Sequence, residues 1–592
     1  MVHPPRPAFL RPSLRVGLPV ILLAALILAA FQQVFKSPFA FDDSISIAQV
    51  HKFASWRDAW GPDAFLFFRP VKNLFFYLVE QAGGETARYH WVNLAAYYIA
   101  ACGVFGLTLR LSGNVLASFA AGAIWALSPT GGTVAVWTSC FNINVAAASM
   151  TFCAIAYDIM RSSTSRHPAL PGAIAAIFLL LGLLSYETAI ATAPLLVLVD
   201  AFRGRKVFSK PSILLYAGIA AIVVTWLVCR QLNGVPGVRA QNPSLPPGMP
   251  YWQLTASAPY FLWTHFAMWL APSGRLETFG SYLWDQSVPA MILPFCWILL
   301  IGIIYLCVRF WKRAPLLAFG AAWFLIAAFP SGNFVPLKNT PYADYYVPIP
   351  SIGLCLMLAA ILRATFERLR EPGVSRPAIG AAVATLLGIA GWRLAQLPVL
   401  TDWLSAWEIP PRVMARTAVV RPHQFFAHAV MAYDIAFAEE KKSEEILTLV
   451  ETSALEAEKD MPDMGIIYTA LGEVARCRGQ HEQAIALFEK ALVSRHTGVD
   501  THLWSRHQLV VTLMEQPSQF DRAYANLLVL LRQGDHKDHP KYVLLAARLM
   551  RQAGKPGEEI KTLEKGLQYH PANADILAEL ENARARAASK PS

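Results

Sequence analysis

Acidic residues are scarce over most of this chain. The first 400 of its 592 residues contain 14 Asp and Glu against 28 Lys and Arg, whereas residues 401–592 contain 26 acidic and 23 basic side chains. The basic residues of the first part stand in short clusters beside apolar runs, where they set the orientation of membrane helices. Nucleic-acid binding requires a contiguous basic face with interleaved aromatics. We therefore expect no nucleic acid as a partner, and we divide the chain at about residue 400.

Cysteine is sparse as well. None of the eight cysteines stands in a CxxC pair, and most lie inside apolar runs, so neither a zinc site nor a disulfide framework is expected. The chain also lacks a P-loop, a Rossmann fingerprint and a Ser/His/Asp arrangement in a suitable context. These absences argue against chemistry driven by a nucleotide.

Apolar sequence, by contrast, is abundant. Hydrophobic residues make up 55% of the chain and the mean hydropathy is +0.38, as in multi-spanning membrane proteins. A helix needs roughly 20 apolar residues without a central charge to cross a bilayer. We predict eleven spans, near residues 16–35, 91–110, 115–133, 138–160, 171–186, 188–202, 212–230, 290–308, 315–330, 345–364 and 377–397.

The charges beside these spans predict their orientation. Residues 1–35 combine a basic start with an apolar core longer than that of a signal peptide, so we expect an uncleaved anchor with a cytoplasmic N-terminus. In this orientation 17 of the 28 basic residues lie on short inner segments, in line with the positive-inside rule. The aromatic run 257–271 breaks that rule if it spans, and we read it as a re-entrant or interfacial helix. The loop 36–90 and everything after about residue 398 then share the outer side of a membrane, which we expect to be the bacterial inner membrane.

An acidic pair, Asp42 and Asp43, follows the first predicted span. Carboxylates are rare in this part of the chain, and adjacent carboxylates repel, which can raise the pKa of one toward that of a usable base while the other stays ionised. Asp is also a favoured N-cap, here for a helix that begins near Ser44. The two roles are compatible, and we interpret the pair as the chemical centre of a membrane enzyme.

The part after residue 400 has a different pattern. Residues 465–498 place Gly472 and Phe488 at the spacing of a tetratricopeptide repeat, with Gly479 between the two helices. A second copy keeps Gly554 at its turn, and degenerate copies are expected nearby. Because such units cannot bury their faces singly, we predict an α-solenoid of three or four stacked repeats with a concave binding surface.

Six strings of the membrane part carry a resemblance to a known family. They are FDDSISI (Phe41 to Ile47), FRPVKNLFFYL (Phe68 to Leu78), RYHWVNLAAYYI (Arg88 to Ile99), ALSPTGGTVAVWTS (Ala126 to Ser139), SYETAIATAPLLVLVDAF (Ser185 to Phe202) and PIPSIGLCLMLA (Pro348 to Ala359). Their order, followed by a repeat tail, resembles that of the transmembrane-and-tetratricopeptide-repeat protein O-mannosyltransferases. These enzymes are GT-C glycosyltransferases that use polyprenyl-phosphate sugars.

The resemblance implies a fold and an activity. The fold is all-α, with a polytopic membrane helical bundle of GT-C type over residues 1–400, which includes an outer catalytic loop 36–90, and an extracytoplasmic tetratricopeptide-repeat domain over residues 401–592. The activity is transfer of a sugar from a polyprenyl phosphate to a hydroxyl of a protein that the repeats recruit. In GT-C enzymes an acid of the first outer loop is implicated in activating the acceptor. This pattern carries over to Asp43 as the base and to Asp42 in an orienting or exchanged role.

Transfer from a lipid phosphate also needs cations on the departing phosphate. Arg69, with Lys72 beside it, is the best local cation and can hold phosphate bidentately, although an Arg at this place can also snorkel to the head groups. His90 and Asn93 stand three residues apart, on one helical face at a membrane entrance, and are further candidates for donor binding. A lone His there is also typical of an interface residue.

Glu187 is the acid most embedded in apolar sequence, which makes it a candidate for orienting the sugar or pairing with a cation. A helix break at the interface is the plainer interpretation. The chain has Tyr186 where the family tends to have lysine, and Tyr345 where it tends to have arginine. Arg239 and Lys338, in predicted outer loops, can replace those cations in donor binding. The identity of the transferred sugar therefore does not follow from the sequence.

No cofactor is predicted. Asp42, Asp43 and Asp344 are hard oxygen ligands on the predicted outer side of the membrane, so they are compatible with a divalent metal. Arg and Lys alone can stabilise a phosphate leaving group, so no metal is predicted. The expected partners are a polyprenyl-phosphate-linked sugar, a protein acceptor and membrane lipids. Two alternatives fit the same pattern: a lipid-linked oligosaccharide ligase of similar architecture, and a catalytically inactive membrane scaffold with a partner-binding tail.

Overall fold

The computed structural model describes two sets of residues and four isolated positions. The first set is 14–36, 43–63, 67–162, 167–233, 251–270, 291–334 and 343–369, and the second is 443–460, 463–494, 499–533, 539–571 and 573–588. Every regular element in these ranges is a helix, which confirms the all-α fold. The chain divides into two compact units, residues 1–409 and 410–592. Each unit is described by itself.

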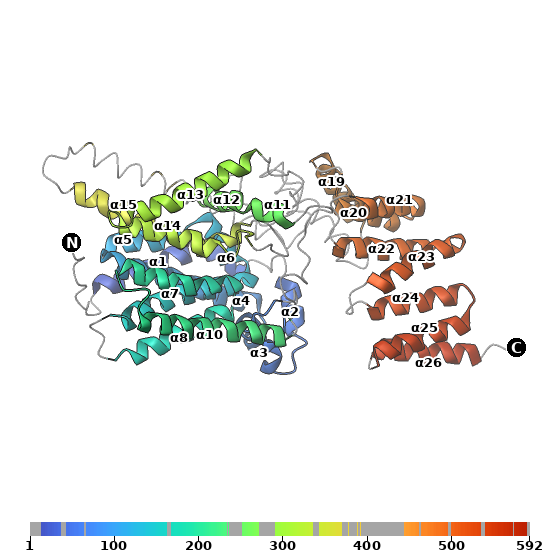
Figure 1. Ribbon diagram of the computed structural model, residues 1–592. Coiled ribbons are helices and arrows are strands. Elements are labelled where there is room, and N and C mark those ends of the chain that lie inside the picture. The colour runs from blue at the N-terminus through green and yellow to red at the C-terminus, as the bar shows by residue number, and fades with distance from the viewer. Residues whose placement is uncertain are drawn as a thin grey trace. The chain divides into compact units, whose positions relative to one another are not determined.

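The first unit is a bundle in which the long helices run side by side (Figure 1). With 3₁₀ helices labelled η, its elements are α1 (Leu14–Phe31), η1 (Gln32–Lys36), α2 (Asp43–Val50), η2 (Trp56–Trp60), α3 (Pro70–Gln81), α4 (Thr86–Ser112), α5 (Val115–Ala126), α6 (Pro129–Val136), η3 (Thr138–Cys140), α7 (Phe141–Met160), α8 (Ala169–Leu183), η4 (Glu187–Ala191), α9 (Thr192–Phe202), α10 (Lys210–Leu232), α11 (Tyr251–Ala256), α12 (Ala258–Leu270), α13 (Ile292–Phe310), α14 (Pro315–Ala328), η6 (Asp344–Tyr346) and α15 (Pro348–Leu369).

Five described segments are long and apolar enough to cross a membrane, and the bent pair α5 and α6 would make six. The five are α4, η3 with α7, α10, α13 and the first part of α15. Three further apolar helices, α1, α8 and α14, are shorter. These helices are compatible with a membrane protein, and the number of eleven spans stays a prediction. Apart from three isolated positions, the eleventh predicted span, 377–397, lies outside the described residues.

The segment 115–133, predicted as one span, is broken in the structure. Helix α5 ends at Ala126, and α6 begins at Pro129 with a bend of 62° between the two. Proline fixes its own backbone angle and has no N–H to donate, so it favours the first turn of a new helix. After the break, α6 contacts η6 and η3 contacts α2.

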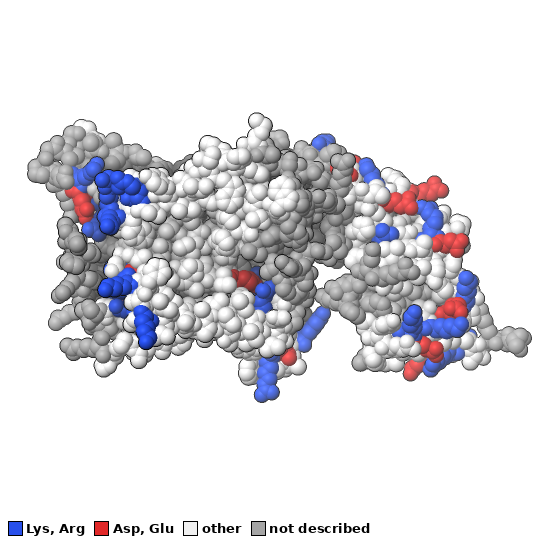
Figure 2. Space-filling view, viewed as in Figure 1, with Lys and Arg blue, Asp and Glu red and all other residues white. Residues whose placement is uncertain are grey.

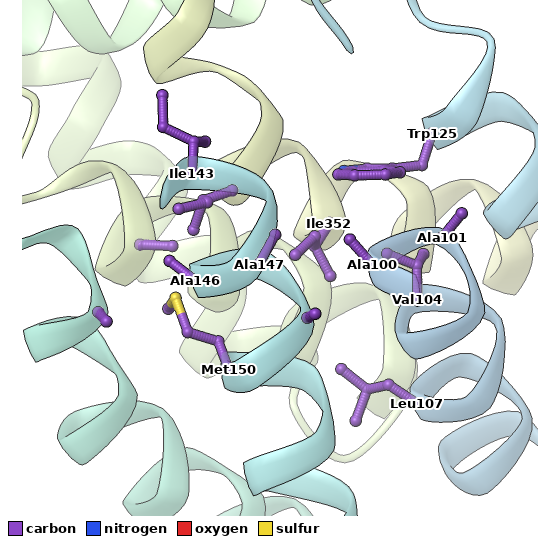
Figure 3. Close-up of a cluster of buried hydrophobic side chains, with 14 of the residues drawn as sticks. Ala100, Ala101, Val104, Leu107, Trp125, Ile143, Ala146, Ala147, Met150 and Ile352 are labelled. Carbon is purple, nitrogen blue, oxygen red and sulfur yellow. The ribbon is translucent and has the colours of Figure 1, made fainter. Parts of the chain in front are cut away.

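Small residues hold the centre of the bundle together. Ala100 and Ala101 of α4 and Ala146 and Ala147 of α7 are at most 1% exposed, and Trp125 of α5 packs beside them (Figure 3). Between helices in a membrane, close packing of small residues replaces the hydrophobic effect as the main attraction.

The approach between α14 and α15 is closer still. A Cβ added to Gly320 would lie 2.5 Å from the carbonyl oxygen of Gly353, so neither position accepts a larger residue without moving a helix.

The charged side chains of this unit gather at the two ends of the helices. Figure 2 shows Lys and Arg at one end, beside α8 and the end of α15, a mixed group at the opposite end, and a largely uncharged band between. Helix α4 joins the two ends, because Asn93 lies near its start and Arg110 near its end. We refer to them as the Asp43 end and the Arg110 end.

The second unit is a series of helix pairs. Its elements are α19 (Glu444–Asp460), α20 (Gly465–Cys477), α21 (His481–Val493), α22 (Val499–Met514), η8 (Pro517–Gln519), α23 (Phe520–Gln533), α24 (His539–Gln552), α25 (Pro556–Tyr569) and α26 (Ala574–Ala588). Successive helices pack against each other. The turns of α20–α21 and α24–α25 contain Gly479 and Gly554 with φ of 74° and 68°, a left-handed backbone that favours glycine.

A buried aromatic ring fills the seam between α20 and α21. Phe488 is completely buried, and Gly472 leaves room for its ring. Glu559 of α25 is an acid that is 97% buried. Its carboxylate accepts a hydrogen bond from Arg586 Nη2 at 2.8 Å. The ion pair offsets the cost of burying the exceptional acid.

We predict that Gly472→Ala destabilises the second unit. The added Cβ would lie 2.6 Å from Phe488 Cε1, and such overpacking costs about 1–3 kcal/mol. Limited proteolysis of the detergent-solubilised full chain during heating should show the tail cleaved at a lower temperature.

Gly557→Ala is the matched control for this change. It lies in α25, and its added Cβ meets no atom within 4 Å, so the variant should keep or gain stability by up to about 1 kcal/mol. Equal losses in both variants would contradict the packing argument.

Candidate active site at the Asp43 end

Asp43 is the first residue of α2 and is completely buried. Its Oδ1 accepts a hydrogen bond from the backbone N–H of Ser139 at 2.7 Å. The carboxylate therefore ties the start of α2 to η3, which lies directly before α7. Asp43 lies inside the helix, so it is not the N-cap that the sequence predicted; Asp42 lies outside the described residues.

Lys72 connects α2 to a second acid. Its Nζ lies 3.2 Å from Asp63 Oδ2 and donates a hydrogen bond to Ser46 Oγ at 3.4 Å. The Lys72 and Asp63 side chains are only 2% and 1% exposed. Burial raises the pKa of Asp63, but the nearby charges of Lys72 and Arg69 outweigh this effect, so the pKa lies below its ordinary value of 3.8. The Asp63 carboxylate is therefore ionised at neutral pH.

Arg69 extends the network to Glu187 of η4. Its Nε and Nη2 donate to Glu187 Oε2 at 3.3 and 3.0 Å. The guanidinium lies over the rings of Phe67 and Tyr186, 4.1 and 5.1 Å from their centroids. Desolvation lowers the pKa of Arg69, but the attraction of Glu187 and Asp63 raises it above its usual range. The cation is thus permanent, and it stacks on Tyr186.

Two polar groups of this pair remain unused within the described residues. Arg69 Nη1 makes no hydrogen bond there, since its nearest acid, Asp63 Oδ2, is 3.9 Å away. Glu187 Oε1 is buried and has no hydrogen-bond partner in the same part of the chain. A buried acceptor without a partner costs about 1–3 kcal/mol. The site therefore offers one donor and one acceptor to a ligand.

The contacts join four predicted residues, Asp43, Lys72, Arg69 and Glu187, into one polar chain. Ser139 Oγ lies 3.5 Å from Ser46 Oγ, which closes the path from Asp43 to Lys72. In formal charge, the two cations Lys72 and Arg69 balance the two acids Asp63 and Glu187.

Asn93 serves this assembly in a different way from the predicted donor binding. Its Nδ2 donates to three backbone carbonyl oxygens, at 3.0, 2.9 and 3.2 Å, in Val134, Ala135 and Trp137. Its Oδ1 accepts from Asn144 Nδ2 at 2.8 Å. These bonds fix the backbone that leads to Ser139. His90, one turn earlier, is completely buried on the same helix.

A further acid, Asp344, lies in η6. It is completely buried and accepts a hydrogen bond from Thr133 Oγ1 of α6 at 2.6 Å. The next residue, Tyr345, packs edge-on against Trp137 with ring centroids 5.4 Å apart. An aromatic contact thus joins η6 to the residue between α6 and η3. Among the described residues, no three His, Cys, Asp or Glu side chains are placed to hold one metal ion.

Asp63 is a member of the network that the sequence did not predict. Asp63 follows Gly61 and Pro62 in the predicted outer loop, and an acid among aromatic residues there was the available signal. Arg239 and Lys338 lie outside the described residues.

An open apolar groove of about 830 Å³ shares the short helix η4 with this network. Its walls come from η4, α9, α12, α13 and α14, and none of the described residues that line it is charged. Ile190 and Ala191 line it and belong to η4, whose first residue is Glu187. The short 3₁₀ helix therefore has the Arg69 contact at one end and the groove at the other.

Comparison of the chain with protein-family models gives no match. Comparison with curated proteins gives no match either.

We predict that Asp63→Asn strongly destabilises the first unit. The change leaves the Lys72 ammonium buried without its nearest acid, and breaking a buried pair costs about 3–5 kcal/mol. The Asp63→Asn/Lys72→Met double variant should recover part of the loss. Thermal unfolding of the detergent-solubilised protein measures both effects.

The pH dependence checks the cause. Because the folded pKa of Asp63 lies below 3.8, its stabilisation is fully present above that value and is lost as pH falls through the folded pKa. The wild type and Asp63→Asn should therefore differ near neutral pH and converge in strong acid. Glu85→Gln is the control, since that side chain is 67% exposed. A comparable loss in the control would contradict the role of the buried pair.

Proposed function

We propose that this protein is a membrane glycosyltransferase of GT-C type that moves a sugar from a polyprenyl phosphate to a hydroxyl of a protein acceptor. The observation that carries the proposal is the adjacency of the apolar groove and the Arg69–Glu187 pair on η4. A polyprenyl phosphate has the same two parts, a long apolar chain and an anionic head. The resemblance of the six sequence strings to GT-C enzymes agrees with this assignment.

Each part of the site has a role in this proposal. The lipid chain lies in the groove, Arg69 Nη1 binds the phosphate, and Glu187 Oε1 accepts a hydrogen bond from a sugar hydroxyl. Asp43 takes the proton of the acceptor hydroxyl while the hydroxyl oxygen forms a bond to the anomeric carbon of the sugar. The bond from that carbon to the phosphate oxygen breaks, and the phosphate leaves with the electron pair. Asp43 is covered in this structure, so the acceptor must displace protein to reach it.

The second unit supports the acceptor side of the proposal. We assign its helix pairs to tetratricopeptide repeats, because glycine turns and the Gly472–Phe488 seam follow that spacing. Such repeats bind other proteins. The proposal further places eleven spans in a bacterial inner membrane, with the Arg110 end in the cytoplasm and the Asp43 end and the repeats outside, in accordance with the positive-inside rule.

We predict that Asp43→Asn abolishes most of the transfer and leaves the fold intact. The amide oxygen can still accept from Ser139 N–H, but it cannot take a proton, and loss of a general base costs about 10²–10⁴-fold in rate. The measurement is transfer of hexose from synthetic polyprenyl-phosphate sugars to Ser and Thr of envelope proteins, followed by mass spectrometry. Glu85→Gln should keep full activity. A folded Asp43→Asn variant with full transfer would overturn the assignment.

We predict that Ala322→Phe impairs use of the lipid donor. Ala322 of α14 lines the groove, and a phenyl ring would occupy space meant for the chain, so KM for long-chain donors should rise more than KM for short ones. Ala173→Phe, at an exposed position on α8, is the control for adding an aromatic ring. An unchanged chain-length preference in Ala322→Phe would speak against lipid binding in this groove.

One observation favours a second function. Lys72 and Arg69 are both paired with acids, and Asp43 is buried, as expected for a polar network with a purely structural role. In this alternative the protein is a membrane scaffold whose tail binds an envelope partner. Wild-type protein that consumes no polyprenyl-linked sugar but retains a partner through residues 443–588 would support it. Transfer of a preassembled glycan, recognised by its mass, would instead indicate an oligosaccharide ligase.

A further inference from the structure

A second polar cluster lies at the opposite end of the bundle, where α4, α7, α9 and α10 end or begin. It contains two aspartates and four arginines, and the proposed transfer reaction does not use it. We refer to it as the arginine cluster; its members are Asp158, Asp200, Arg110, Arg161, Arg203 and Arg205.

Asp158, at the end of α7, is bound by three of the arginines. Arg110 Nε lies 2.7 Å away, Arg203 Nε and Nη2 lie at 3.0 and 2.8 Å, and Arg205 Nη2 lies at 2.7 Å. Arg203 also donates to the backbone carbonyl of Arg110 at 2.9 Å. The aspartate is 2% exposed, so its negative charge faces the inside of the bundle.

Asp200, at the end of α9, is also saturated. Tyr157 and Tyr216 donate their hydroxyl hydrogens to it at 2.6 and 2.8 Å, and Arg205 Nη1 donates at 2.9 Å. Arg161 Nη2 lies 3.4 Å from it and donates to a neighbouring serine hydroxyl at 2.8 Å. The Asp200 side chain is 0% exposed.

The positive charge of the four arginines therefore exceeds the negative charge of the two aspartates. Four guanidiniums face two carboxylates, which leaves two positive charges, and the arginine side chains are 17–25% exposed whereas the acids are covered. Both terminal nitrogens of Arg110, and Nη1 of Arg161 and of Arg203, make no hydrogen bond within the described residues. The cluster is thus a fixed, partly open group of unused cationic donors.

The position of the cluster along the helices defines its surroundings. Helix α4 has 27 residues, or about 40 Å, against about 30 Å for the hydrocarbon core of a bilayer. Arg110 lies two residues before its end, at the level of lipid head groups. Beside the cluster, α10 presents Ile213 and Leu214, which are 52% and 64% exposed, as expected of side chains that face acyl chains.

We propose that the arginine cluster binds the phosphate head group of an anionic phospholipid. Guanidinium forks match phosphate oxygens, and basic pockets between membrane helices bind such head groups. The adjacent exposed apolar side chains favour a lipid over a free anion. The site is separate from the Asp43 end and does not depend on the transfer activity.

The test uses the purified full chain in a neutral detergent. Cardiolipin, phosphatidylglycerol, phosphatidylcholine and inorganic pyrophosphate are titrated, and binding is followed by the rise in unfolding temperature and by native mass spectrometry. We expect saturable binding of the two anionic lipids and none of phosphatidylcholine. Arg110→Gln should weaken the apparent affinity about fivefold, as for loss of one basic residue at a membrane surface. Arg110→Lys should retain most of it.

Lys312→Gln is the matched control, since Lys312 is an exposed basic residue after α13 and the change removes the same charge. Arg161→Gln is the second test variant should Arg110→Gln fail to fold, because Asp200 keeps Arg205 and two tyrosines. Equal weakening by Lys312→Gln would show nonspecific attraction, and equal binding of pyrophosphate would show a site for free anions. Either result, or unchanged lipid binding in both arginine variants, would overturn the proposal.

Discussion

The contact between Lys72 and Asp63 is the interaction on which the Asp43 end depends. Two charges with almost no exposure are stable only when each has its partner, because removing either leaves an uncompensated charge in a medium of low dielectric constant. Lys72 also reaches Ser46 on α2, and Asp63 lies within 4 Å of Arg69. Three segments of the chain must therefore assemble together before Asp43 and Glu187 take the positions that the proposed chemistry requires.

The two ends of the bundle both contain buried acids paired with cations, but they differ in the balance of charge. At the Asp43 end, cations and acids of the Lys72–Glu187 network match in number, and within the described part of the chain one guanidinium nitrogen and one carboxylate oxygen remain without a hydrogen bond. At the Arg110 end the acids are covered and the cations are in excess. Burial of one sign of charge leaves the other to face the surroundings, which determines the ligand that each end can accept.

Aromatic contacts and an ion pair support the packing in both units. The ring of Tyr186 lies beneath the Arg69 guanidinium, and Tyr345 packs against Trp137. In the second unit, Arg586 donates a hydrogen bond to the buried carboxylate of Glu559. Aromatic stacking and ion pairing thus hold charged and polar side chains inside packed helices.

The sequence by itself determined the all-helical character, the presence of several long apolar helices and the glycine turns of the tail, because hydrophobic periodicity and backbone freedom are local properties. It also selected Asp43, Arg69, Lys72 and Glu187 as candidates. Only the tertiary structure decided that these side chains meet, that Asp63 completes their network, and that Asn93 binds the backbone that leads to Ser139. Such outcomes depend on contacts between residues up to 118 positions apart, for which local pattern carries no signal.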